Sequence, residues 1–108
     1  MPLVHKVCML YKLFHGFLIL FPKHERYTLG QKIENTVLET LELILSASYT
    51  SVYKNEILRK ANNKIDLLKH IVRLAQETDS IKLKNYLALE QTIIEIGKMI
   101  GGWRRSLK

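Results

Sequence analysis

Residues 58–75 read LRKANNKIDLLKHIVRLA. Apolar side chains recur in this stretch at steps of three or four residues, which places them on one stripe of an α-helix. The stripe consists of Leu58, Ala61, Ile65, Leu68, Val72 and Ala75. Four further side chains, Ile57, Leu67, Ile71 and Leu74, widen the apolar arc to about 200°, against the roughly 100° that a surface helix needs. We therefore expect a helix that is either deeply buried in a bundle or in contact with a second subunit.

Three more apolar seams with helical spacing accompany this stretch. They are Val4, Val7, Tyr11, Phe14, Leu18 and Phe21; Ile33, Val37, Leu41 and Ile44; and Tyr86, Leu89, Ile93, Ile96, Ile100 and Trp103. No segment alternates with a period of two, as a half-buried strand would. The seams predict helices at approximately residues 3–20, 28–47, 54–77 and 83–103. Short connections favour antiparallel neighbours, so we expect an all-α, up-down-up-down four-helix bundle that forms one domain over residues 1–108.

Local signals place the ends of these helices. Pro22 ends the first one because the residue before a proline avoids the α region. Thr28 and Gln31 fit a capping box, in which the hydroxyl accepts a backbone hydrogen bond and the glutamine reaches back. Residues 48–53 are rich in hydroxyl groups and predict a loop, and residues 78–80 (Thr-Asp-Ser) break the third helix.

The chain is basic. Its 108 residues include 17 Lys and Arg against 10 Asp and Glu, for a formal net charge of +7. Residues 28–53 hold one base and three acids, whereas residues 80–108 hold six bases and two acids. A positive surface on the first, third and fourth helices favours an acidic partner, either nucleic acid or an anionic surface.

The sequence argues against a membrane span and a disulfide. Cys8 is the one cysteine, so no intrachain disulfide can form, and a reducing, cytoplasmic location is expected. The stretch from Leu13 to Pro22 is far shorter than the roughly 20 apolar residues that a bilayer requires. It imitates a signal peptide, but no small-residue cleavage site follows it.

Nothing in the sequence predicts catalysis or a cofactor. The four histidines, His5, His15, His24 and His70, do not pair at a metal-ligand spacing on one helix. No glycine-rich phosphate loop follows a strand, and no nucleophile lies near a base at a recognisable spacing. We expect no catalytic residue, no metal site and no cofactor.

Clusters of basic residues are the stronger functional signal. They are Lys69 and Arg73 with Arg59 on the same side of the third helix, Lys60 and Lys64, and finally Arg104, Arg105 and Lys108 at the C-terminus. Asp66 is spaced to pair with Lys69 or Arg73. One such cluster alone would be an ordinary solvated face or a complement to a helix dipole. Several clusters in a chain of this charge favour anion binding through phosphate contacts.

Two other groups of residues have alternative interpretations. Tyr49 and Tyr53 could stack on bases, or pack within a loop. Gly97 and Gly101 share a face and would let another backbone approach closely, because glycine inside a helix otherwise costs about 1 kcal/mol relative to alanine. For Gly101 with Gly102 the alternative is a helix C-cap. Candidates for helix packing or assembly are Gly97, Gly101, Trp103, Leu67, Ile71 and Leu74.

Three stretches together resemble a known family. They are FPKHERYTLGQKI (residues 21–33), LLKHIVRLA (residues 67–75) and EIGKMIGGW (residues 95–103). Their order and spacing resemble the accessory variability determinant (Avd) proteins of diversity-generating retroelements. These belong to a wider family of small four-helix proteins that includes those encoded by intervening sequences in bacterial 23S ribosomal RNA genes. The likeness covers nearly the whole chain from Phe21 onward.

The resemblance implies a fold, partners and a role. It implies a four-helix bundle that assembles as a homopentameric barrel with a positive surface. It implies binding to a reverse transcriptase and to nucleic acid, RNA or DNA, in adenine-directed mutagenic copying, without catalysis of its own. The family's basic pair on the third helix corresponds to Lys69 and Arg73, where lysine lacks the bidentate geometry of arginine.

Other functions remain open from the sequence. One is a ribosome- or RNA-associated protein of the 23S intervening-sequence type, without a reverse transcriptase. A second is an enzyme with a site between subunits, which would require inward-pointing polar residues that the seams lack. A third is a structural helical oligomer whose charge only keeps it in solution.

Overall fold

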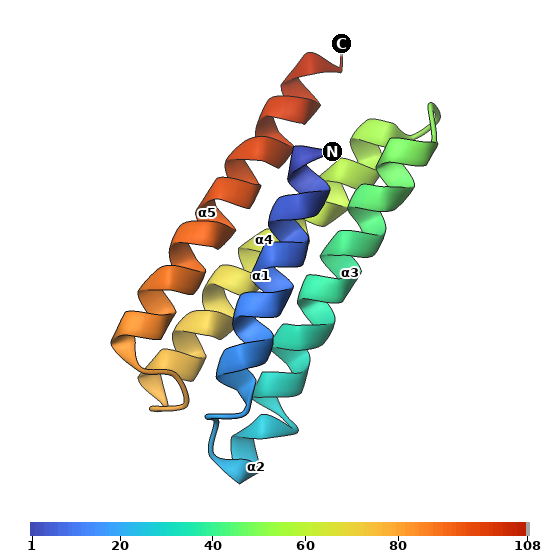
Figure 1. Ribbon diagram of the computed structural model, residues 1–108. Helices are drawn as coiled ribbons and strands as arrows, with labels where there is room; N and C mark the ends of the chain where they lie inside the picture. Colours follow the sequence, from blue (N-terminus) through green and yellow to red (C-terminus); the bar gives the residue numbers. More distant parts are fainter. Residues whose placement is uncertain (108) are drawn as a thin grey trace.

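The computed structural model describes residues 1–107, whose helices lie side by side along one axis (Figure 1). The helices are α1 (Pro2–Leu18), α2 (Lys23–Arg26), α3 (Leu29–Tyr49), α4 (Lys54–Glu77) and α5 (Leu83–Ser106). The long helices α1, α3, α4 and α5 alternate in direction, which confirms the predicted all-α four-helix bundle. Lys108, which the sequence assigns to the C-terminal basic cluster, lies outside the described residues.

The four long helices form a closed ring around one apolar core. α1 packs against α3 and α5, and α4 packs against the same two helices from the opposite side. All six side chains of the α4 seam are buried, as are Tyr86, Leu89, Ile93, Ile96 and Ile100 on α5. None of the helices in residues 1–107 is both long and apolar enough to cross a membrane.

The buried face of α1 is rotated from the predicted seam. Leu3, Val7, Leu10 and Phe14 form its centre, whereas Val4 and Tyr11 are half-buried at its edge. The predicted seam and the observed buried face both have helical spacing. Which of them faces the core depends on how α1 docks against the other helices, and the sequence of α1 alone does not specify this.

Buried polar groups in α3 are satisfied within the helix itself. Thr36 and Thr40 are fully buried, although the apolar seam omits them. The Thr36 hydroxyl donates to the Lys32 carbonyl oxygen at 2.7 Å, and the Thr40 hydroxyl donates to the Thr36 carbonyl oxygen at 2.8 Å. Because both bonds stay inside α3, the core needs no polar contact between helices here.

The connection between α1 and α3 differs from the prediction. The short connection contains the helix α2 at residues 23–26. Thr28 is the N-cap of α3, but the predicted capping box there is wrong. The Thr28 hydroxyl donates to the carbonyl oxygens of His24 and Glu25 at 3.3 and 3.4 Å. Gln31 donates instead to the Asn35 side chain at 3.1 Å. The Thr28 hydroxyl is therefore directed to the end of α2, and it makes no capping hydrogen bond to α3.

The other two connections end their helices in different ways. Asp79 adopts a left-handed conformation with φ of 63°, and the Ser80 amide donates to the Ala75 carbonyl oxygen at 2.8 Å, which closes a Schellman motif after α4. This confirms the predicted break. α3 continues to Tyr49, so the predicted loop at residues 48–53 shrinks to residues 50–53.

Gly30 allows the close approach of α1 and α3. A Cβ atom at this position would lie 2.5 Å from Leu18 Cδ1 and 3.3 Å from Phe21 Cδ2. By contrast, a Cβ atom at Gly16 on α1 would meet nothing within 4 Å. Of these two glycines, only Gly30 lies where an added Cβ atom would force neighbouring side chains to shift.

We therefore expect Gly30→Ala to unfold at lower urea concentration than the wild type, and Gly16→Ala to unfold at the same or higher concentration. The two changes gain similar helix propensity, so overpacking should make Gly30→Ala about 1–3 kcal/mol less stable than Gly16→Ala. Equal free energies of unfolding for the two variants would show that the core adjusts around residue 30 without cost.

Candidate nucleic-acid interface

Lys69 and Arg73 lie on the exposed side of α4, but each has acidic neighbours. Lys69 Nζ lies 3.9 Å from Asp66 Oδ1, as the spacing predicts. The pKa of Arg73 is raised, first by the adjacent Tyr86 side chain and also by the carboxylates of Glu90 and Glu77. The positive potential of this pair is therefore partly balanced by its surroundings.

The other predicted cations of α4 divide into paired and unpaired groups. Lys64 Nζ lies 3.1 Å from Glu39 Oε1 and joins α4 to α3. Arg59 donates from Nε to Glu56 Oε2 at 3.2 Å and from Nη2 to the other carboxylate oxygen. Lys60 is exposed, and no ion pair forms at it within residues 1–107.

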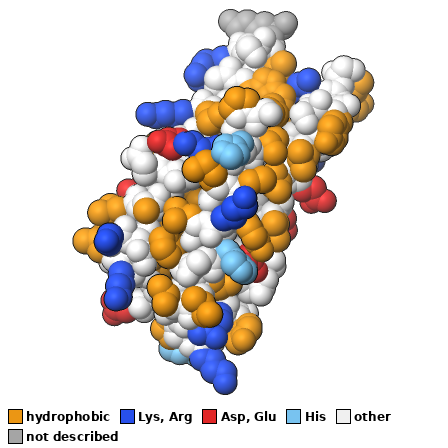
Figure 2. All heavy atoms as spheres, viewed as in Figure 1, with side chains coloured by type: hydrophobic (Ala, Val, Ile, Leu, Met, Phe, Trp, Pro, Cys, Tyr) orange, Lys and Arg blue, Asp and Glu red, His pale blue; other side chains and the backbone are white. Residues whose placement is uncertain are grey.

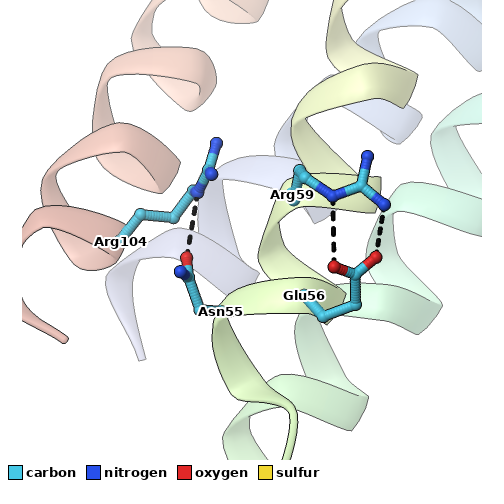
Figure 3. A network of polar contacts seen from close by, with 4 residues as sticks. All are labelled: Asn55, Glu56, Arg59 and Arg104. Carbon is cyan, nitrogen blue, oxygen red and sulfur yellow. Dashed lines mark hydrogen bonds and ion pairs between the residues drawn. The ribbon is translucent and has the colours of Figure 1, made fainter. Parts of the chain in front are cut away.

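Arg104 and Arg105 meet the start of α4 at one end of the bundle. Arg104 Nε donates to Asn55 Oδ1 at 3.2 Å. Figure 3 shows Arg104 reaching across from α5 to Asn55, while Glu56 is turned toward Arg59. Among the described residues neither Arg104 nor Arg105 forms an ion pair with a carboxylate. These two arginines are therefore available to an anion.

A hollow of about 300 Å³ lies between these side chains, lined by Asn55, Gly101, Arg104 and Arg105. A Cβ atom at Gly101 would lie 3.3 Å from Arg105 Nη1, so the guanidinium folds back over this glycine. Because α5 continues to Ser106, the alternative that Gly101 and Gly102 cap the helix is wrong. Gly101 instead opens space on the helix surface beside the two arginines.

The acidic side chain of Glu56 also lies at this end of the bundle. The hydrogen bond from Arg59 holds the pKa of the Glu56 carboxyl below its ordinary value, and the charges of Lys60 and Arg104 act in the same direction. Glu56 therefore stays ionised at neutral pH with its charge directed to Arg59. The surrounding bases outnumber it.

Lys54 and Trp103 hold the ends of α4 and α5 together. Lys54 Nζ lies 5.8 Å from the centroid of the Trp103 ring, a cation–π contact. Trp103 is half-buried and continues the α5 seam at its edge. It therefore joins two helices of one bundle. The sequence did not predict a role for Lys54 or Asn55. Their contacts with Trp103 and Arg104 on α5 cannot be inferred from a lysine and an asparagine at the start of a helix.

The remaining candidates for packing or assembly lie at different depths. Ile71 is buried, Leu67 is half-buried and Leu74 is 48% exposed. A Cβ atom at Gly97 would lie 3.5 Å from Ile65 Cγ2, which is an ordinary contact distance. Close packing inside the bundle therefore does not require glycine at this position.

No group of three or more His, Cys, Asp or Glu side chains in the described part of the chain could hold a metal ion. His15 lies 3.4 Å from Glu34, and Lys6 lies 2.9 Å from Glu95, but neither pair belongs to such a group. The arrangement at the end of the bundle consists of hydrogen-bond donors and positive charges. Groups of this kind can bind an anion.

The described chain matches one protein family along its whole length. The bAvd-like family matches residues 1–107, which include all three stretches that carry the resemblance to Avd proteins. No curated protein matches the chain. The chain therefore belongs to the Avd family, as a bAvd-like member.

Proposed function

We propose that this chain is a non-enzymatic accessory protein that binds a retroelement reverse transcriptase and nucleic acid, and so supports mutagenic retrohoming. The match to the bAvd-like family over residues 1–107 carries the proposal. Family membership supports an accessory role without catalysis. The template RNA or its cDNA is the proposed nucleic acid, in the cytoplasm, where Cys8 stays reduced.

The charge of the chain supports contact with a phosphate backbone. The net charge is +7, and Figure 2 shows Lys and Arg side chains spread over the visible face with hydrophobic side chains between them. A strand that crosses such a face meets several separate cations. Each contact with a phosphate releases counterions, which gives affinity without sequence preference.

Exposed ion pairs such as that of Lys69 with Asp66 do not prevent this contact. Surface pairs contribute little to stability, because solvent screens them and ordering the side chains costs entropy. A phosphate can replace the carboxylate as the partner of the cation at small cost. Lys69 and Arg73 therefore remain proposed contacts, together with Arg59, Lys60, Lys64, Arg104 and Arg105.

We expect Lys69→Glu with Arg73→Glu to weaken RNA binding about tenfold or more while leaving the helical circular dichroism unchanged. Loss of two phosphate contacts should lower the slope of log K against log salt by about 1.4 for a single strand. Fluorescence anisotropy across a salt titration measures both quantities. The matched control is Lys12→Glu with Lys32→Glu, which makes the same change in charge on exposed residues of α1 and α3. Equal effects of the two double variants would show that only net charge matters.

We also expect the chain to elute from a sizing column together with the reverse transcriptase encoded near it, at low ionic strength and with template RNA present. The accessory role requires a complex of the chain and the polymerase that remains intact during the column run. Binding to RNA without any joint elution with the polymerase would contradict this role and favour an RNA-associated protein of the 23S intervening-sequence type.

We propose that the chain assembles as a homopentamer, as its family resemblance implies. Leu74 is 48% exposed on α4, beside the half-buried Leu67. Gly97 and Gly101 lie on α5, where the bundle itself leaves room for a Cβ atom at Gly97. In a subunit contact, the exposed leucine would be buried, and the glycine would let the backbone of a second subunit approach closely.

We expect Leu74→Glu to lower the mass of the assembly measured by light scattering, because a subunit contact would have to bury its carboxylate. The control is Leu38→Glu on α3, where the leucine is 42% exposed. A monomeric wild-type protein would contradict the proposed assembly. An unchanged mass in Leu74→Glu would remove Leu74 from the interface.

A further inference from the structure

Two tyrosines near the connection between α3 and α4 have exposed side chains. Tyr49 is 84% exposed and Tyr53 is 77% exposed. The alternative that these rings pack within the loop is therefore wrong. A tyrosine ring left in water contributes almost nothing to the core, so its presence here calls for another explanation.

Tyr53 also has an unfavourable backbone conformation. It precedes α4 with φ of 61° and ψ of 19°, in the left-handed region, and its side chain makes no capping hydrogen bond. Glycine or asparagine would adopt this conformation at lower cost and would suit the end of a helix better. The fold therefore gains nothing from a tyrosine at this position.

The ring lies next to the anion-binding side chains. A second hollow, of about 410 Å³, is lined by Tyr53, Lys54, Asn55 and Glu56 together with Ser51 and Leu107. Asn55 also lines the hollow that contains Arg104 and Arg105. The two hollows thus share one residue, with two arginines on one side of it and an aromatic ring on the other.

We propose that this end of the bundle binds one nucleotide of a single-stranded nucleic acid, with its phosphate between Arg104, Arg105 and Asn55 and its base against Tyr53. Guanidinium groups bind phosphate through paired N–H donors, and the Asn55 amide orients Arg104 toward the hollow. Exposed aromatic rings next to basic side chains are the usual means of holding unpaired bases. A duplex keeps its bases stacked on each other, so the ring selects a single strand.

Charge at the site agrees with this ligand. Lys54 lines the second hollow with its Nζ held over Trp103, and Lys60 lies near Glu56. Among the described residues that line the second hollow, Glu56 has the one carboxylate, and two donors of Arg59 engage it. The net potential around the nucleotide is therefore positive.

The test compares two fluorescein-labelled strands of about 12 nucleotides, within the range that one small binding module covers. One is oligo-dT and the other is an abasic strand with the same phosphates, and anisotropy gives the dissociation constant of each. We expect the wild type to prefer oligo-dT. Tyr53→Gly should bind oligo-dT about fivefold to a hundredfold more weakly and the abasic strand equally well, because it loses only stacking. Its thermal unfolding should be unchanged or shifted upward, since glycine relieves the left-handed conformation.

Further variants separate the phosphate contact from the stacking contact. Arg104→Ala with Arg105→Ala should weaken both strands about tenfold or more, because it removes charge and not stacking. Tyr27→Ala is the matched control, since Tyr27 is 67% exposed and lies at the end of α2 instead of beside the hollows. It should behave as the wild type does.

The site rests on the proposed binding of nucleic acid, and the outcomes distinguish the two proposals. If the wild type binds both strands and Tyr53→Gly keeps the preference for bases, the stacking site is wrong and nucleic-acid binding stands. If the double variant Arg104→Ala with Arg105→Ala binds both strands as the wild type does, the proposed phosphate position is wrong and nucleic-acid binding elsewhere on the chain stands. If the wild type binds neither strand, both proposals fail.

Discussion

Burial of one face of α4 between α3 and α5 is the constraint on which the rest of the molecule depends. Leu58, Ala61, Ile65 and Leu68 on this face are completely inaccessible to solvent. Each large aliphatic side chain buried in this way stabilises the fold by about 1.5–3 kcal/mol. Because the face is apolar along its whole length, α4 has one orientation in the bundle. That orientation fixes which of its polar residues are exposed.

An apolar interior leaves the surface as the place for function. The buried hydroxyls of Thr36 and Thr40 are used inside α3, so they offer nothing to a ligand. Outside the core, the bases of α4 and α5 divide into those that form ion pairs and those that do not. Lys64 links α4 to Glu39 on α3, whereas Arg104 and Arg105 form no ion pair among the described residues. The end of the bundle thus presents two arginines that pair with no carboxylate of residues 1–107.

The spacing of apolar residues predicts the long helices well. These helices are stabilised by burial of one apolar face, and such a face requires apolar residues at every third or fourth position. The ends of α4 and the six residues of its seam agree with the prediction. Features that depend on competition between neighbours were missed. Thr28 and Gln31 have the sequence of a capping box, yet the Thr28 hydroxyl is directed to carbonyl oxygens of α2 and does not cap α3. The capping pattern of Thr28 and Gln31 says nothing about the residues before it. It therefore cannot show that a short helix will form there and attract the threonine hydroxyl.

The candidate site shows the same limit more strongly. Spacing along one helix finds Lys69 near Asp66, because both residues lie on one surface three positions apart. It cannot find Asn55 beside Arg104, since these residues are 49 positions apart and meet only when α4 and α5 run antiparallel. Exposure of Tyr53 is equally invisible in the sequence, because a tyrosine in a short loop can turn toward the core or away from it. Charge composition therefore suggests that an anion binds, while the docking of helix ends determines where it can bind.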